Sequence, residues 1–487
     1  MSKLQISRAD KFGMVLLVLA MVMPVAFLTT PPMVDILGHM GRFTLQTGLD
    51  QQPFLQHFYS FEWQIIGNLG TDLIVQLLHP LLGTVGATKL AVLLVPLFAT
   101  TAIVTLSYQM HRRVTPFAIL ALALVFCLPF TWGFLNFSLA MSLALLAYVL
   151  WNYLGSGWCR TWVFVPISVI VWLCHTFGLA FLGILCTAEA LARHCPSRKS
   201  LFDGLQATVR DCLPLLTPLI PMLMWRSSAS GSGIDGWFDF QQKAGWLISI
   251  VRLHGEWTDK ASAIALLAAI CLGVFHRRVT VAPTIAVAAS IALIAFLVLP
   301  RQIFGSVFAD MRLAPYVAML ALLSFQDATL SARARTALMV AALAFLGFRL
   351  ALTTHVYHDR ERQLETHLAA LTAIPEQARV ATLVQIPCQS EWALPWFSHI
   401  GSVAITRKHA FANDQWANSS MNPLKVHFPA AGAYATDDRQ LFFPGHCGMQ
   451  PTLAQSLKAL PVTAFTHVWI IGPSPKSFIG KDGLTLR

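Results

Sequence analysis

Residues 90–106 read LAVLLVPLFATTAIVTL, a run without a charged side chain. An α-helix needs roughly 20 apolar residues to cross a hydrocarbon core of about 30 Å, and this run approaches that length. A helix at the surface of a soluble core has charged or polar positions every few residues, and this run does not show that pattern. Comparable apolar blocks recur at 14–28, 118–129, 139–150, 261–274 and 284–299. These blocks predict membrane-spanning helices.

The composition indicates the same class of protein. Of 487 residues, 56% are hydrophobic and 12% are charged, against roughly 25% charged in an average soluble domain. The net charge of +11 would fit a nucleic-acid-binding protein. The basic residues, however, gather at every second loop between apolar blocks, which is the pattern of cytoplasmic loops, so we expect no nucleic-acid partner. The clusters are Lys3, Arg8 and Lys11; Arg112 and Arg113; Arg160; Arg193, Arg198, Lys199 and Arg210; Arg277 and Arg278; and Arg333 and Arg335.

The pattern predicts an α-helical integral membrane protein with about eleven transmembrane helices. The charge clusters place the N-terminus inside, and an odd number of spans then places the C-terminus outside. Two of the helices flank an outer turn at 131–136. The other nine are expected at 11–29, 87–108, 162–174, 177–191, 212–225, 261–275, 283–299, 313–325 and 336–352.

Two domains are expected. Residues 1–353 form the polytopic transmembrane domain, including a long first outer loop at 30–86, in which 73–82 reads as an amphipathic interfacial helix. Residues 354–487 form a small extracytoplasmic α/β domain. Its expected elements are a helix at 359–373 and strands at 379–386 and 466–471.

Two cysteines, Cys388 and Cys447, stand apart from the others in this outer domain. In an oxidising compartment a disulfide between them is the expected arrangement. A metal site that uses His446 and Cys447 is the alternative, although no CxxC or HxxxH spacing supports it. The other seven cysteines lie in or near predicted membrane helices and their cytoplasmic loops, where we expect them to be packing residues.

The start of the first outer loop, PPMVDILGHMGR at 31–42, carries the strongest candidate site. In a helix, Asp35, His39 and Arg42 occupy positions i, i+4 and i+7 and share one face. There Asp35 could take a proton from a hydroxyl with His39 as its partner, and Arg42 could bind a phosphate group. The alternative is an ordinary ion pair on a solvated interfacial helix.

Other polar residues fall at predicted outer ends of helices or later in the first loop. Ionisable groups near membrane depth are costly and tend to face a cavity, so these residues are candidates for substrate binding. Each also has a plainer explanation, as a solvated carboxylate or an arginine that reaches to the interface. The candidates are Glu62, Asp72, His175, Asp310 and Arg312.

This arrangement resembles the GT-C type of membrane glycosyltransferases, which use polyprenyl-phosphate-linked sugars. One apolar helix precedes a long outer loop that opens with an acidic residue, and many helices and an outer C-terminal domain follow. The DxxxHxxR segment also resembles a group of bacterial membrane proteins with a similar motif at this place. Further parts of that pattern are Gly133-Phe-Leu-Asn-Phe, Asp310-x-Arg312 and Arg407-Lys-His-Ala-Phe411.

The resemblance implies an inverting glycosyltransferase of the bacterial inner membrane, with Asp35 as catalytic base. Its implied partners are a polyprenyl-phosphate-linked sugar, membrane lipids and a glycan or lipid acceptor. No cofactor is certain; a divalent cation, Mg²⁺ or Mn²⁺, is the candidate. Asp35 is followed by Ile36 rather than by a second acidic residue, so Glu62, Asp72 and Asp310 compete for the second acidic position. The alternatives are a transporter or flippase and a non-catalytic scaffold of polysaccharide assembly.

Overall fold

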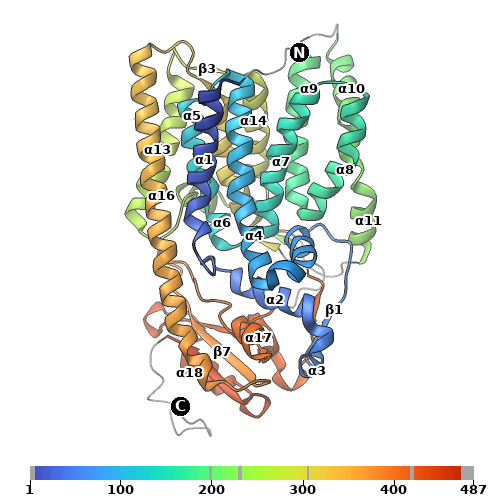
Figure 1. The fold of residues 1–487 in the computed structure, drawn as a ribbon, viewed down its shortest axis with the longest axis vertical. Helices are drawn as coiled ribbons and strands as arrows, with labels where there is room; N and C mark the ends of the chain where they lie inside the picture. The colour runs from blue at the N-terminus through green and yellow to red at the C-terminus, as the bar shows by residue number, and fades with distance from the viewer. Residues whose placement is uncertain (1–5, 197–199, 229–232, 304–305, 417–421, 473–487) are drawn as a thin grey trace. The chain divides into compact units, whose positions relative to one another are not determined.

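The computed structural model (Figure 1) describes residues 6–196, 200–228, 233–303, 306–416 and 422–472. The chain divides into two compact units, which we treat separately. Unit 1 comprises Met1–Phe27, Ile65–Thr71 and Leu90–His355. Unit 2 comprises Leu28–Gln64, Asp72–Lys89 and Val356–Arg487.

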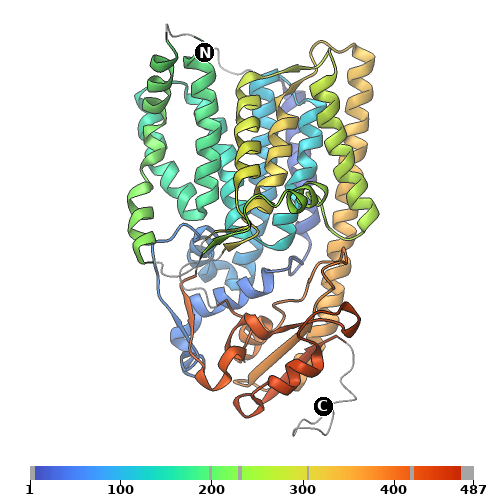
Figure 2. The same ribbon diagram turned by 180° about the vertical axis from the view of Figure 1, so that it is seen from behind.

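Unit 1 is built from helices, most of which run side by side (Figures 1 and 2). α4 and α16 contribute to both units. Short strands form two small sheets: β2 (Ile234–Asp235), β4 (Gln302–Ile303) and β5 (Ser306–Val307) in one, and β3 (Thr280–Val281) with β6 (Phe325–Gln326) in the other. The helices are α1 (Arg8–Ala26), α4 (Gly70–His111), α5 (Pro116–Leu122), α6 (Leu128–Trp132), α7 (Leu135–Leu154), α8 (Trp158–Cys174), α9 (Thr176–His194), α10 (Leu201–Cys212), α11 (Leu219–Ser228), α12 (Phe240–Ile248), α13 (Glu256–Phe275), α14 (Pro283–Val298), α15 (Ala309–Ser324) and α16 (Ala332–Leu368).

Six helical segments in the described part of the chain are long and apolar enough to cross a membrane. They include α1, α4, α7, α9, α13 and the stretch that begins with α16, and shorter apolar helices lie at Pro116–Trp132, Trp158–Cys174 and Pro283–Val298. This content is that of a helical membrane protein. The number of eleven spans and their orientation remain predictions from the sequence.

The helix expected at 212–225 is not continuous. α10 ends at Cys212, a 3₁₀ turn follows at Leu213–Leu216, and α11 begins at Leu219. Pro214 and Pro218 lie in this interval, and proline removes a backbone donor and clashes with the preceding turn. The prolines therefore interrupt the single helix that the hydropathy pattern predicts over 212–225.

Two other helices are longer than expected. The helices predicted at 336–352 and 359–373 form one helix, α16, to Leu368, since no glycine or proline separates them. The helices predicted at 73–82 and 87–108 both lie in α4. Gly83 breaks the helical geometry there with φ of 67° and ψ of 167°, a conformation that glycine adopts without the steric cost of a Cβ atom.

Unit 2 contains the predicted α/β fold. Strand β7 (Arg379–Gln385) pairs in parallel with β11 (His467–Ile471), β10 (Leu441–Phe442) and β8 (Phe411–Ala412). Residues 380–384 of β7 are all buried, which is typical of a central strand in a parallel sheet with both faces covered. The remaining elements of the unit are α2 (Ile36–Gly48), α3 (Pro53–Gln56), β1 (Tyr59–Phe61), α17 (Ser402–Lys408), β9 (Leu424–Val426) and α18 (Leu453–Ala459).

Most of the first loop belongs to unit 2, at Leu28–Gln64 and Asp72–Lys89, which differs from the expected boundary at 353/354. Strand β1 pairs antiparallel with β9, and α2 packs against α17. Tyr59 donates a hydrogen bond to the Ala412 carbonyl at 2.7 Å. The apolar side chains of 45–59 thus share one core with those of the C-terminal segment. Burial of this surface joins the loop to the C-terminal segment.

Candidate functional site

The candidate site of unit 2 begins at Asp35, the residue that precedes α2. An aspartate at this position commonly caps the helix by accepting a hydrogen bond from a backbone N–H of the first turn. Asp35 makes no such capping bond. Its side chain is 14% exposed, and its Oδ1 lies 3.7 Å from Nε2 of His399. The carboxylate therefore faces an imidazole rather than the end of its own helix.

His399 was not singled out by the sequence. Its Nδ1 lies 2.8 Å from the backbone carbonyl oxygen of Asp414. Since a carbonyl oxygen only accepts, Nδ1 carries the proton and Nε2, on the side of Asp35, carries the lone pair. Burial lowers the pKa of His399 to about 4, so the imidazole is neutral at neutral pH.

Two glycines allow α2 to approach this region. A Cβ atom on Gly38 would lie 2.7 Å from Cη2 of Trp416 and 2.9 Å from Cγ of His399, and one on Gly41 would lie 2.7 Å from Cβ of Ser402. Contacts this short do not occur between real side chains. The glycines between the polar residues of the motif therefore have a packing role.

We expect Gly38→Ala to destabilise unit 2 by about 1–3 kcal/mol, because two rings must move to admit one methyl group. Gly48→Ala is the matched control, since Gly48 ends the same helix and a methyl group there would have no atom within 4 Å. Thermal unfolding of the full-length protein in detergent measures both. Equal melting temperatures for the two variants would contradict the close packing of α2.

Arg42 forms a buried ion pair with Asp72. Nη1 contacts Oδ1 and Nη2 donates to Oδ2 at 3.2 Å, so that the guanidinium meets the carboxylate with both nitrogens. The side chains are 4% and 0% exposed. Gln46 also donates to the backbone carbonyl of Asp72 at 2.9 Å. This pair ties α2 to the first turns of α4, which is a structural role for two residues that the sequence offered as substrate-binding candidates.

His39 lies between these two groups of residues along α2. Its Nδ1 is 3.4 Å from Nη2 of Arg42, and its ring centroid is 5.0 Å from that of Trp416. Trp416 in turn is 4.5 Å from the ring of His399. His39 and Arg42 of the predicted face thus contact each other, and the C-terminal segment adds a second histidine and a tryptophan beside them.

Glu62 lies elsewhere in unit 2. Its side chain is more than half exposed and forms an ion pair with Lys425 at 2.5 Å. Glu62 directly follows β1, and Lys425 lies in the paired strand β9. An exposed pair of this kind contributes little to stability. With Glu62 paired to Lys425 and Asp72 paired to Arg42, neither offers Asp35 a second carboxylate for a divalent cation. We therefore derive no step through a metal ion.

Unit 1 brings together two of the segments that carried the family resemblance. The guanidinium of Arg312 lies 4.1 Å from the ring centroid of Phe134 and 5.9 Å from that of Phe137. Arg312 also donates to the Val307 carbonyl at 3.3 Å. His175 is buried, and its ring lies 5.6 Å from that of Phe137. The two predicted residues His175 and Arg312 therefore both lie beside Phe137, and Arg312 also lies beside Phe134.

Asp310 has a separate environment. Its Oδ2 lies 3.4 Å from Nζ of Lys243, and both side chains are almost fully buried. Lys243 also donates to the carbonyls of Phe296 and Leu299 at 2.8 and 2.6 Å. These carbonyls belong to the end of α14, where backbone acceptors lack helical partners. Asp310 is thus part of a buried arrangement that caps a helix, which favours a structural role.

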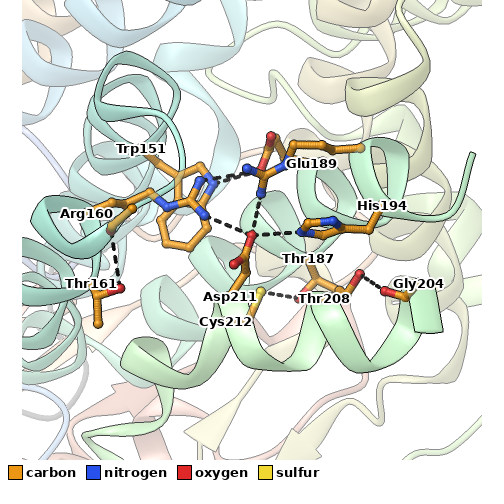
Figure 3. A network of polar contacts seen from close by, with 12 residues as sticks. Trp151, Arg160, Thr161, Thr187, Glu189, His194, Gly204, Thr208, Asp211 and Cys212 are labelled. Carbon is orange, nitrogen blue, oxygen red and sulfur yellow. Dashed lines mark hydrogen bonds and ion pairs between the residues drawn. The ribbon is translucent and has the colours of Figure 1, made fainter. Parts of the chain in front are cut away.

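A larger ionic network of unit 1 lies outside the sequence-derived candidates (Figure 3). Asp211 Oδ2 accepts from Arg160 at 3.0 Å and from Arg193 at 2.6 Å, and it lies 3.0 Å from Nε2 of His194. Glu189 accepts from Arg193 and from the indole of Trp151. The network connects α7, α8, α9 and α10.

Cys388 and Cys447 form a disulfide with Cα atoms 5.5 Å apart. His446 lies beside it, with Nε2 3.6 Å from Sγ of Cys388. In the described residues, Cys388, His446 and Cys447 are also the group whose ligand atoms lie close enough to hold a metal ion. The disulfide uses both sulfur atoms, so the arrangement is the one that the sequence predicts for an oxidising compartment.

Two carboxylates, the buried Asp414 and the partly buried Asp437, have raised pKa values. Burial raises the pKa of Asp414 to about 7, and Asp437 contributes to this shift. The pKa of Asp437 is also raised to about 7, by burial and by the adjacent Asp438. Asp414 accepts hydrogen bonds from the backbone N–H and the hydroxyl of Ser402 at 2.6 and 2.8 Å.

These pKa values predict a dependence of stability on pH. Because the folded-state pKa of Asp414 lies above the unfolded value, its stabilising effect is lost as the pH rises through about 7. His399, with its folded-state pKa lowered to about 4, has the opposite effect below its unfolded pKa of roughly 6.5. We therefore compare variants: the melting temperature of the wild type, relative to that of Asp414→Asn, should fall between about pH 4 and about pH 7, the unfolded-state and folded-state pKa values of Asp414. A constant difference, with exposed Asp50→Asn as control, would contradict the assignment.

No family model matches the chain, and no curated protein matches it. The function must therefore be inferred from the residues and their geometry.

Proposed function

We propose that the chain is a membrane glycosyltransferase. It moves a sugar from a polyprenyl-phosphate donor to an envelope glycan, lipid or protein acceptor at the outer face of the bacterial inner membrane. The observation that carries this proposal is the position of Asp35: a carboxylate at a helix start that does not cap the helix and lies 3.7 Å from the imidazole of His399. The helical membrane architecture and the resemblance of the 35–42 segment support it.

The chemistry requires one base. Asp35 takes the proton of an acceptor hydroxyl, whose oxygen attacks the anomeric carbon of the donor sugar. The bond between that carbon and the phosphate oxygen breaks, the configuration inverts, and polyprenyl phosphate leaves with the electron pair. Arg42 is engaged by Asp72, so we assign it to holding α2 rather than to the phosphate. Arg312, a substrate-binding candidate from the sequence, lies in unit 1 and is given no role in this step.

Transport of a lipid-linked or polar substrate is the second candidate, and one observation favours it. Arg349 of α16 and Asp259 of α13 form a buried pair at 3.0 Å, and ionisable groups at membrane depth often mark substrate pathways. The pair also has a structural explanation. Asp259 accepts the backbone N–H groups of Leu253 and His254, and Arg349 donates to the Val251 carbonyl.

The test is deletion of the gene in the source bacterium, with mass spectrometry of the envelope glycans. In parallel, purified protein in liposomes receives the polyprenyl-phosphate sugars extracted from the same membranes, together with envelope acceptors isolated from the deletion strain. Loss of one sugar from the glycans and release of free polyprenyl phosphate in the liposomes are the expected results. Movement of intact lipid-linked sugar across the bilayer would favour transport. Wild-type glycans in the deletion strain would overturn the proposal.

A further inference from the structure

Two hydrogen-bond acceptors face each other at the start of α2. One is Oδ1 of Asp35, and the other is Nε2 of His399, 3.7 Å away. The distance exceeds that of a direct hydrogen bond. The tautomer of His399 excludes such a bond to an ionised Asp35 as well, because Nδ1 carries the proton. A ligand that binds both atoms must therefore bring a hydrogen to each of them.

The tautomer is fixed by the surrounding residues. The Asp414 carbonyl oxygen is 2.8 Å from Nδ1 of His399, while the amide nitrogen of Gln440 is farther away at 3.5 Å. Asp414 is itself held by two hydrogen bonds from Ser402. The lone pair of Nε2 is thus kept on the side of Asp35.

The same region offers an aromatic ring. Trp416 lies beside both His39 and His399 and is partly exposed. Carbohydrate C–H groups pack on such rings, and hydroxyl groups beside them need polar partners. A carboxylate, an imidazole acceptor and an indole next to one another are a set that suits a sugar ring.

We propose that Asp35 and His399 bind two adjacent hydroxyl groups of one acceptor, so that the acceptor is a sugar with a vicinal diol. This inference rests on the proposed function, since Asp35 receives the hydroxyl that reacts. The neighbouring hydroxyl donates to Nε2 of His399 and keeps its proton throughout. Oxygens on adjacent ring carbons lie about one hydrogen-bond length apart. This spacing matches the two hydrogen-bond acceptor atoms, Oδ1 of Asp35 and Nε2 of His399, which are 3.7 Å apart.

An acceptor substrate with a single hydroxyl group fits Asp35 and His399 less well. A serine side chain or a simple lipid alcohol would satisfy Asp35 and leave Nε2 of His399 without a donor. A buried acceptor left unsatisfied is costly, and sites built around a hydroxyl discriminate strongly against analogues that lack it. The same argument disfavours a primary hydroxyl whose neighbouring carbon carries no hydroxyl group.

The first arm of the test is linkage analysis of the glycan that the deletion strain lacks. Methylation of the wild-type glycan, followed by mass spectrometry, identifies the substituted carbon of the acceptor sugar. We expect a free hydroxyl on a carbon next to that linkage. A peptide, a lipid alcohol or a linkage without an adjacent free hydroxyl overturns the inference and leaves the proposed function intact. An unchanged glycan in the deletion strain overturns both.

The second arm compares variants in the complemented strain at matched membrane levels. His399→Leu removes the hydrogen-bond acceptor atom Nε2 and should lower sugar transfer about tenfold, the effect of one hydrogen bond. His399→Gln can still accept through its amide oxygen and should retain more transfer. His57→Leu, at an exposed position of the first loop, is the control. Full sugar transfer by His399→Leu overturns the inference. If Asp35→Asn fails to transfer sugar while His399→Leu transfers it fully, the proposed function is supported and the inference is not.

Discussion

Asp35→Asn is expected to reduce sugar transfer by about 10²–10⁴-fold, the usual contribution of a general base. Asparagine has nearly the shape of aspartate, but it cannot accept the proton of the attacking hydroxyl. The melting temperature of the variant reports on its folding separately from transfer. The two measurements together distinguish a loss of chemistry from a loss of stability.

The measurement is complementation of the deletion strain, with glycans quantified by mass spectrometry at equal membrane levels of each protein. Asp50→Asn is the matched control, since Asp50 lies in the same loop and is exposed. Glu62→Gln is a second control, because the exposed Glu62 pairs with Lys425. If Asp35→Asn restores the glycan as fully as the controls, Asp35 is not the base, and transport or scaffolding becomes the better explanation.

The sequence predicted the helices of unit 1 well where composition alone determines them. The apolar run at 90–106 lies within α4, and the block at 284–299 corresponds to α14. Transmembrane hydropathy is a local property, because each backbone group in lipid must bond within its own helix. The errors occurred where a residue type interrupts or extends a helix, as the prolines do between Cys212 and Leu219.

The site was predictable only in part. Helical spacing places Asp35, His39 and Arg42 near one another, and this is local information. The contact between Asp35 and His399 joins residues 364 positions apart, and no spacing rule predicts it. The available signal was indirect: the polar run Asn413-Asp414-Gln415 lies between the apolar pairs Phe411-Ala412 and Trp416-Ala417, and in the structure all three polar residues are buried.

The assignment of Arg42 shows how a structure changes the meaning of a motif. From the sequence, an arginine at the membrane border is a candidate ligand for phosphate. In the structure both terminal nitrogens contact the carboxylate of Asp72. An arginine in such a pair stabilises the fold of unit 2, and its effect on activity would then be indirect.

Arg42→Ala is therefore expected to destabilise unit 2 by about 3–5 kcal/mol, the usual effect of removing one partner from a buried ion pair. The carboxylate of Asp72 is 0% exposed, so the variant leaves a buried charge without its ion-pair partner Arg42. The exposed pair Glu62–Lys425 supplies the control, and Lys425→Ala should cost less than about 1 kcal/mol. Melting temperatures and protease resistance of the full-length protein measure both variants. Equal losses of stability in Arg42→Ala and Lys425→Ala would show that the buried Arg42–Asp72 pair does not hold α2 in place.

The double variant Arg42→Met with Asp72→Met separates the structural role from phosphate binding. Replacing both charges by apolar side chains of similar volume is often close to neutral for stability, because no unpaired charge remains. If Arg42 only holds α2, the double variant should regain much of the melting temperature and sugar transfer that Arg42→Ala loses. If stability returns but transfer does not, the guanidinium acts on the substrate. The carboxylate of Asp72 would then position Arg42, and the motif would have the role first predicted for it.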